Sequence, residues 1–218
     1  MSRREKSNRT RGGGIGTPDG YLYELTGGEF CLDFANTVDS RPTDAARELL
    51  ADYGDLVRWS LQAKAITPRV AKRLRARAIQ HKRQATAVLR RARALREAIF
   101  ETFSALTRGV SPPTATLDVL NEHLSNALVR RRLTHNDCTY RWEWDTEDAL
   151  DRVLWPVVQS AAELLTSDRL DRVRECGADN CAWLFLDQSK NRSRRWCDMA
   201  VCGNRVKASR FRQGQRAS

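Results

Sequence analysis

The sequence lacks the long apolar runs that cross a membrane. No stretch of its 218 residues approaches the roughly 18 to 20 apolar residues that a spanning helix needs. Residues 1–6 are charged and lead through polar residues to three consecutive glycines, without the apolar segment of a secretory signal. We therefore expect a cytoplasmic protein without a membrane partner.

Signals of catalysis are also scarce. The sequence contains only three histidines, His81, His123 and His135, and their spacing fits neither a metal site nor a catalytic triad. A glycine-rich phosphate loop and a nucleophile motif are lacking as well. The sequence therefore favours a protein that is not an enzyme.

Acidic residues are few compared with basic ones. The 27 Asp and Glu face 38 Lys and Arg, and the resulting net charge of +11 favours a polyanionic partner such as nucleic acid. Residues 188–218 contain nine basic residues and one acid, Asp198. A second basic block, residues 69–108, is typical of the solvated face of long helices.

Four of the six cysteines form two C-x4-C pairs separated by fifteen residues: Cys176, Cys181, Cys197 and Cys202. Two close pairs joined by a loop can enclose a tetrahedral Zn²⁺, and we predict one structural zinc ion without an open position for catalysis. Disulfides or free thiols are the alternative, but a reducing cytoplasm disfavours disulfides. Cys31 and Cys138 have no close partner and are expected to be small buried residues.

Apolar periodicity predicts a mainly α-helical fold. Helical patterns begin after Asp52 and again at Thr67-Pro68, which reads as a cap followed by a first helical residue, and an amphipathic stripe covers 88–106. Further helices are expected over 114–132 and over 146–167, with a kink or fresh start at Pro156. Alternating aromatic and charged residues predict a minor β-hairpin over 133–145.

The composition divides the chain into three parts. Residues 1–18 are too polar to bury enough surface to fold and are expected to form a disordered basic arm. An α-rich domain is expected over 19–168. A small zinc module is expected over 169–218, as a treble-clef-like finger built from a β-knuckle, a hairpin and a helix.

Three polar residues interrupt an apolar stretch near the start of the α-rich domain: Asp33, Asn36 and Thr37. Buried polar groups need hydrogen-bond partners. These residues are expected either to brace neighbouring backbone, which is the ordinary outcome, or to line a ligand pocket that would admit a small-molecule effector.

The zinc module carries the predicted nucleic-acid contacts. From Asn204 the pattern is that of a helix with a thin apolar face, suited to a phosphate backbone or a major groove. We expect contacts from Lys190, Arg192, Arg194, Arg195, Arg205, Lys207, Arg210 and Arg212. Some arginines, foremost Arg174, Arg195 and Arg205, could instead offset the charge of about −2 on a zinc tetrathiolate.

A resemblance to the CGNR zinc finger family covers residues 176–205, which read CGADNCAWLFLDQSKNRSRRWCDMAVCGNR, and residues 27–38, GGEFCLDFANTV, are similar to the start of the ABATE domain. The resemblance implies a bacterial, stress-induced transcription regulator with the four cysteines as zinc ligands. We predict that the finger binds double-stranded DNA while the N-terminal domain senses an effector or mediates association, for example as a homodimer. The alternative is a zinc-stabilised module that binds RNA or protein without sequence-specific DNA binding.

Overall fold

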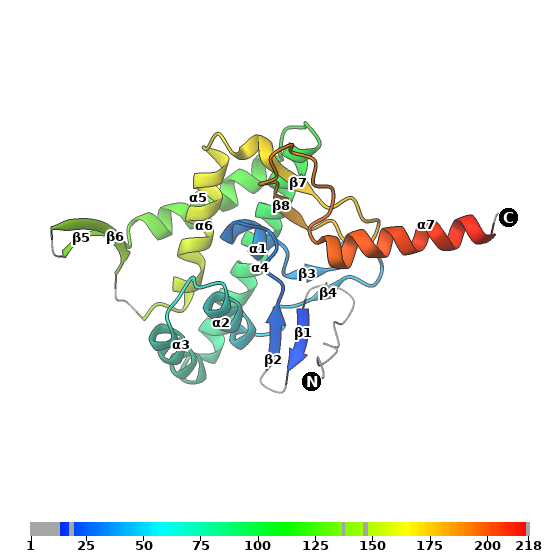
Figure 1. Ribbon diagram of the computed structural model, residues 1–218. Coiled ribbons are helices and arrows are strands. Elements are labelled where there is room, and N and C mark those ends of the chain that lie inside the picture. Colours follow the sequence, from blue (N-terminus) through cyan, green and yellow to red (C-terminus); the bar gives the residue numbers. More distant parts are fainter. Residues whose placement is uncertain (1–13, 18–19, 137, 146–147, 217–218) are drawn as a thin grey trace, which may run out of the picture.

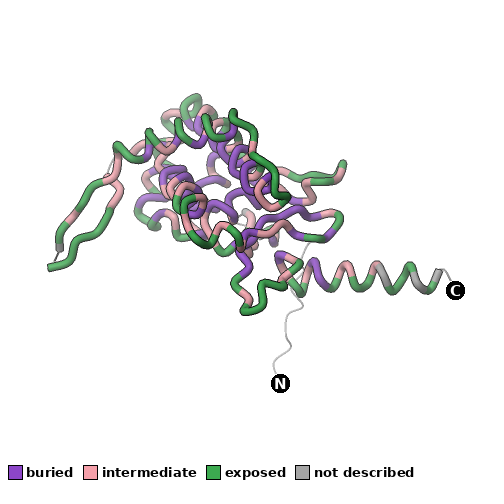
Figure 2. The backbone as a smooth tube through the Cα atoms, turned by 90° about the horizontal axis from the view of Figure 1, so that it is seen from above, coloured by how far each residue is buried: buried purple, intermediate pink, exposed green. Residues whose placement is uncertain are grey.

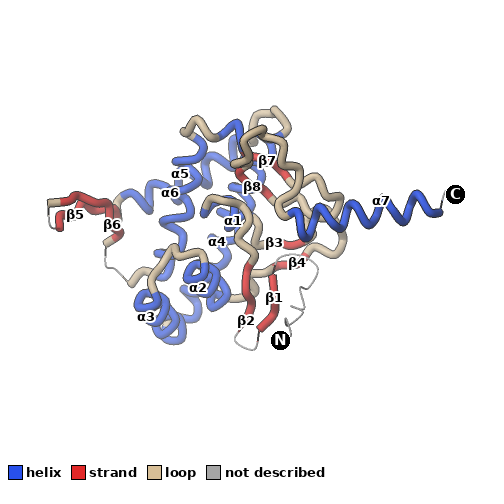
Figure 3. Tube along the Cα trace, in the orientation of Figure 1, coloured by secondary structure: helices blue, strands red, loops and turns tan. Residues whose placement is uncertain are grey.

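The structure is a computed structural model that describes residues 14–17, 20–136, 138–145 and 148–216. Helices dominate it, and the strands form small antiparallel pairs (Figure 3). The predicted mainly α fold with a minor β component is therefore confirmed. Among the described residues, no helix combines the length and the apolar composition that crossing a bilayer requires.

The longest helix, α4 (Lys82–Thr107), forms the centre of the body (Figure 1). Leu95, Ile99 and Phe103 lie on its apolar stripe and are 0% exposed, as the periodicity predicted. Four helices and one single turn pack around it: α1 (Phe30–Ala35), α2 (Tyr53–Gln62), α3 (Pro68–Gln80), α5 (Thr114–Leu128) and η1 (Leu150–Leu154). Helix α6 (Trp155–Leu165) packs on α1 and α5.

Helix starts follow the local sequence signals. Asp52 caps α2 in a capping box with Asp55, and the Thr67 side chain accepts from the Val70 amide, 3.3 Å away, directly before Pro68 opens α3. Pro156 occupies the first turn of α6, after the 3-10 turn η1, so it marks a fresh start. The caps satisfy amides that a helix leaves without partners at its first turn, whereas proline has no backbone N–H there that would need a partner.

The basic block at 69–108 lies on α3 and α4, and its side chains are mostly exposed, as expected of a solvated helix face. Arg96 is the exception, because it is 4% exposed. Its guanidinium contacts both oxygens of Glu48, at 2.6 and 2.8 Å, and also Glu97. A buried charge needs such partners, so Arg96 fixes α4 against the preceding segment.

The predicted hairpin is formed by β5 (Arg131–Asn136) and β6 (Thr139–Trp144), which project from the body (Figure 1). Helix α5 ends at Leu128 rather than near residue 132, because the strand pairing with β6 starts at Arg131. Cys138 is exposed at the hairpin turn, with φ of 68°, which corrects the expectation of a buried residue. Cys31 is fully buried, as expected.

Part of the expected disordered arm is a strand. Residues 1–13 and 18 lie outside the described residues, but β1 (Gly14–Thr17) pairs with β2 (Gly20–Tyr23). Gly14 permits the pairing, because a Cβ on it would lie 1.9 Å from the Leu22 carbonyl oxygen and its φ is 136°. A second short pair joins β3 (Val38–Asp39) to β4 (Arg47–Glu48).

The C-terminal module begins with η2 (Leu170–Arg172) and the antiparallel pair β7 (Val173–Glu175) and β8 (Leu184–Leu186). It continues through the single turn η3 (Met199–Gly203) into α7 (Asn204–Arg216). Val173, Leu184 and Leu186 belong to the same core as the helices. The first half of this module is therefore built into the helical body, whereas α7 extends away from it (Figure 2).

Candidate metal centre and nucleic-acid interface

The four cysteines of the C-x4-C pairs meet in one buried cluster. Their sulfur atoms all lie within 4.8 Å of one another. The Cys197 sulfur lies 3.6 Å from those of Cys181 and Cys202. A tetrahedron with Zn–S distances of about 2.3 Å has sulfur–sulfur edges of about 3.8 Å, so the arrangement fits a four-thiolate zinc site.

Backbone hydrogen bonds hold each pair in place. The Cys176 amide donates to the Trp183 carbonyl at 2.8 Å, which closes the knuckle between β7 and β8. In the second pair, the Cys202 amide donates to the Asp198 carbonyl at 2.9 Å, and the Asp198 carboxylate caps η3 through the Val201 amide. The ligands are therefore oriented by two short turns.

The cluster requires a cation to carry four thiolates. Hydrogen bonding to Cys176, together with contacts to the other two thiols and burial, raises the pKa of Cys197 far above its usual range. Without a metal ion, the four sulfurs could not all be deprotonated at neutral pH. Zn²⁺ supplies the compensating charge, and four protein ligands leave no position for a reacting water. The donor set supports one structural zinc ion.

Asp187 organises the arginine-rich loop that follows β8. Its carboxylate is 0% exposed and accepts from the Ser189 amide at 2.9 Å and the Arg194 amide at 3.0 Å. Burial alone would raise the pKa of Asp187, but hydrogen bonds from Ser189 and Arg194 outweigh it and lower the pKa. Sequence reasoning did not single out this residue, although Asp-x-Ser is the pattern of an Asx-turn.

Asn36 ties the finger to the helical body. Its amide nitrogen donates to the Leu184 carbonyl and its amide oxygen accepts from the Leu184 amide, both at 2.8 Å. Nearby, the Trp183 indole donates to the Val38 carbonyl at 2.9 Å, and the Leu186 amide donates to the Gly27 carbonyl at 2.8 Å. These contacts hold the outer edge of β8 against α1 and the segments on either side of it.

The other two residues of the expected pocket also have partners within the protein. The Asp33 carboxylate accepts from the Gly27 amide at 2.7 Å, while burial raises the pKa of Asp33 to about 7. The Thr37 hydroxyl donates to the Phe34 carbonyl at 2.8 Å and accepts from Arg96. These contacts match the bracing alternative, and a ligand pocket at these three residues stays a prediction.

The predicted nucleic-acid contacts fall into two groups. Arg194 and Arg205 are half-buried and hold the finger itself. Arg194 donates to the Trp196 carbonyl at 2.9 Å and to the Cys197 carbonyl, and it lies 4.5 Å from the Phe185 ring centroid. Arg205 donates to the Asn180 side chain at 3.0 Å.

The second group is exposed: Lys190, Arg192, Arg195, Lys207 and Arg212. Arg192 is held in the left-handed region, with φ of 50°, and pairs with Asp171. Arg195 lies over the Trp196 ring at 5.6 Å. The side chain of Arg210 lies outside the described residues, although its backbone is part of α7.

Helix α7 begins directly after the last zinc ligand and packs mainly on η3. Beyond its first turns, the side chains of α7 that the structure describes are exposed or half-exposed, including Phe211, which is 66% exposed (Figure 2). Its thirteen residues include five Lys or Arg and no acid. A polar helix of this length is marginal in water without a partner.

The comparisons with known proteins agree with this architecture. The ABATE family model, described as "Putative stress-induced transcription regulator", matches residues 28–168. The model of the CGNR zinc finger matches residues 172–215 and contains the whole cysteine cluster. No match to a curated protein reaches significance.

Proposed function

Because the chain belongs to the ABATE family, which carries the description "Putative stress-induced transcription regulator", and ends in a CGNR zinc finger, we propose that it regulates transcription by binding double-stranded DNA through that finger. The N-terminal domain is the regulatory part, which senses an effector or mediates association, and a homodimer stays a prediction. The zinc ion has a structural role, because it fixes the start of α7.

The observation that carries the proposal is α7 itself. It is anchored at one end by the zinc cluster, projects from the body and bears cations without a single acid. Its length of about 20 Å suits the major groove, which is about 12 Å wide and admits one α-helix. Contact with phosphates would also stabilise a helix that has few partners within the chain.

The exposed cations of the loop lie on the same module. The Asp187 carboxylate accepts hydrogen bonds from both ends of the loop that contains Arg192. The Arg194 side chain in turn donates to the carbonyl of Cys197, one of the expected zinc ligands. Zinc binding, loop shape and the direction of α7 are therefore coupled. Loss of the metal is expected to remove the whole surface rather than a single contact.

The RNA alternative depends on exposed aromatic rings in the finger, on which unpaired bases would stack. Trp183 is only 3% exposed and its indole nitrogen is already bonded to the body. Trp196 is half-buried beneath Arg195. The two tryptophans therefore offer no open stacking surface. Phe211 on α7, which is 66% exposed, is a ring on which single-stranded RNA could stack, so the competition experiment decides between the two partners.

The proposal is tested by measuring duplex affinity of the zinc-loaded protein at several salt concentrations. Five exposed cations predict that the logarithm of the association constant falls with the logarithm of salt with a slope of about −4.5. Lys207→Gln should reduce the slope by about one unit. Arg83→Gln removes an exposed cation at the N-terminal end of α4 and is the matched control, which should leave the slope unchanged.

A flat salt dependence, or equal effects of the two substitutions, would contradict duplex binding by the finger. Competition with single-stranded RNA of the same length separates the alternatives. Displacement of the duplex by a lower concentration of RNA would favour the RNA-binding function.

A further inference from the structure

The hairpin of β5 and β6 carries an aromatic face that stands clear of the helical body (Figures 1 and 2). Residues that pair directly across the strands share one face of the hairpin. Leu133 pairs with Trp142 and His135 with Tyr140, so these four side chains lie together. Leu133 is 59% exposed, Tyr140 72% and Trp142 61%. An exposed apolar cluster of this kind marks an interaction site.

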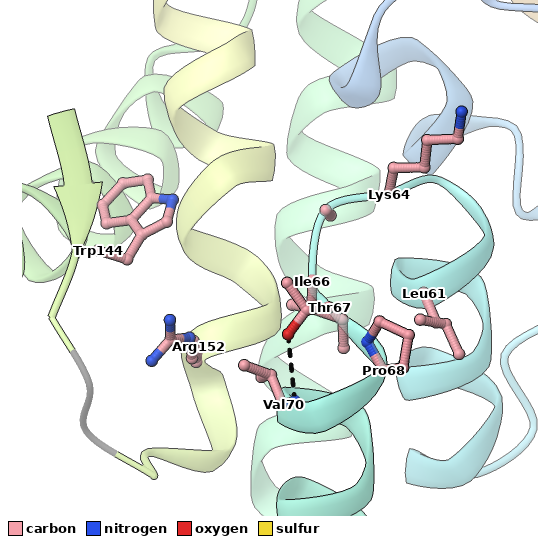
Figure 4. A pocket seen from close by; sticks show the side chains of 9 residues that line it. Leu61, Lys64, Ile66, Thr67, Pro68, Val70, Trp144 and Arg152 are labelled. Carbon is pink, nitrogen blue, oxygen red and sulfur yellow. Dashed lines mark hydrogen bonds between the residues drawn. The ribbon is translucent and has the colours of Figure 1, made fainter. Parts of the chain in front are cut away.

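The base of the same face packs against the body. The centroid of the Trp144 ring lies 5.7 Å from that of Trp155, and Trp144 lines a cavity together with Ile66 and Val70 (Figure 4). Arg131 pairs with Trp144 across the strands and lies 4.2 Å from its ring centroid. The base is therefore anchored, whereas the outer rings face solvent. A sheet of two strands is marginally stable in water, so packing of those outer rings on a partner would stabilise the hairpin.

The charge of the hairpin favours a second copy of the chain as that partner. Residues 131–145 contain three basic and three acidic residues, whereas the whole chain carries a net charge of +11. Arg141 pairs with Glu143 at 2.6 Å, and Arg132 lies 3.7 Å from Asp145. Two copies can therefore meet here without the repulsion that their net charge imposes elsewhere, and a polyanion gains little from this surface.

The exposed rings supply a large part of the area that a weak dimer needs. An aromatic side chain buries about 150 to 250 Å², so the exposed parts of Tyr140 and Trp142 amount to about 200 to 330 Å² in each copy. A symmetric pair buries both sets, and Leu133 adds to them. The rings alone then supply about a third to a half of the roughly 1,200 Å² at which stable interfaces begin, so we expect association in the micromolar range.

We infer that the aromatic faces of two hairpins, formed by Leu133, His135, Tyr140 and Trp142, pack on one another across a two-fold axis and make the chain a homodimer. Such an interface is self-complementary, because the same patch serves both copies. The hairpin and α7 lie at opposite ends of the molecule (Figure 1), so this pairing leaves both fingers open. The inference rests on the association proposed for the N-terminal domain and not on DNA binding by the finger.

The test uses the one exposed thiol of the chain. Cys138 is exposed at the hairpin turn, while the other five cysteines are buried. Zinc-loaded full-length chains labelled at Cys138 with a donor or an acceptor dye are mixed without DNA at physiological salt. A six-residue strand spans about 20 Å, so paired hairpins bring the two labels within about 40 Å of each other. Energy transfer between copies should therefore rise with concentration until it saturates.

Sedimentation equilibrium of the unlabelled protein gives the dissociation constant for the variants. Tyr140→Ser and Trp142→Ser should each raise it at least about thirtyfold, because a two-fold interface loses each ring twice. Ile79→Ser removes an apolar side chain from α3 that is 72% exposed, as Tyr140 is, and as the matched control it should leave the constant unchanged. Tyr140 lies near the tip of the hairpin, so Tyr140→Ser should keep the Tm and the zinc content of the wild type.

A chain that stays monomeric up to about 500 µM would overturn the inference together with the association role. A dimer without energy transfer between Cys138 labels would overturn the inference alone, as would a dimer that Tyr140→Ser and Trp142→Ser leave unweakened. Unchanged mass with weaker binding of single-stranded RNA in Trp142→Ser would assign the face to nucleic acid instead. The transfer and sedimentation measurements contain no DNA, so their failure leaves the DNA-binding proposal standing, and absence of DNA binding leaves the dimer standing.

Discussion

Asn36→Ala should loosen the zinc finger from the helical body. The Asn36 side chain makes two hydrogen bonds of 2.8 Å to the amide and carbonyl of Leu184, which is 0% exposed. Alanine leaves both backbone groups buried without these partners, and each such group costs about 1 to 3 kcal/mol. The expected loss in the free energy of unfolding is therefore about 2 to 6 kcal/mol.

The assay is urea unfolding of the zinc-loaded protein, followed by far-UV circular dichroism. A loss of this size is a large part of the roughly 5 to 15 kcal/mol that stabilises a typical domain. Asn121→Ala, on the exposed face of α5, is the matched control and should change stability by less than about 0.5 kcal/mol. Zinc retention against a chelator should fall only in Asn36→Ala, because β8 carries the knuckle that holds the first cysteine pair.

Asn36→Asp provides a second comparison. Its carboxylate can still accept from the Leu184 amide, but it cannot donate to the Leu184 carbonyl and places negative charge beside it. It should therefore destabilise the protein as well. If Asn36→Ala unfolds at the same urea concentration as the wild type and keeps zinc equally well, the attachment of the finger to the body through Asn36 is refuted.

Three further predictions concern the metal, the loop and pH. Cys197→Ser should reduce bound zinc from one equivalent to none and abolish DNA binding. It should also lower Tm of the whole protein, because β7 and β8 share the main core. Unchanged zinc content by atomic absorption would refute the assignment of Cys197 as a zinc ligand. Arg194→Gln should weaken zinc retention, measured by competition with a chelator, without reducing the salt slope of DNA binding. Lys207→Gln should reduce the salt slope and leave zinc retention unchanged. The pKa of Asp33 is raised to about 7 in the folded state, so this group contributes a loss of stability as pH rises from about 4 towards 7 and no further change above that. Thermal unfolding is measured at pH 6 and at pH 8 with zinc present. Between these two pH values the free energy of unfolding should fall by about 1 kcal/mol more in the wild type than in Asp33→Asn. An equal fall in both proteins would contradict the raised pKa of Asp33.

The sequence predicted features that depend on neighbouring residues. The zinc ligands follow from two cysteine pairs, and the starts of α2, α3 and α6 follow from Asp52, Thr67 and Pro156, because caps and prolines act within one helical turn. The hairpin of β5 and β6 follows from the alternation around Trp142. Each signal is local, so no tertiary information was needed.

Features that depend on distant contacts could not be predicted in the same way. Asn36 and Leu184 are 148 residues apart, and nothing near either residue indicates their pairing. The structural role of Arg194 likewise depends on carbonyls whose direction is set by the zinc turn. The strand β1 was missed, although residues 17–20 read Thr-Pro-Asp-Gly, which has the composition of a β-turn.

The central claim is that zinc shapes a surface that recognises duplex DNA, and selection from a pool of random duplexes tests it most directly. The zinc-loaded protein should enrich a defined sequence and bind it about a thousandfold more tightly than a scrambled duplex at physiological salt. Guanines are expected in that sequence, as partners of the exposed arginines, and a chelator should abolish the enrichment. Absence of enrichment, or enrichment that persists without zinc, would contradict the account.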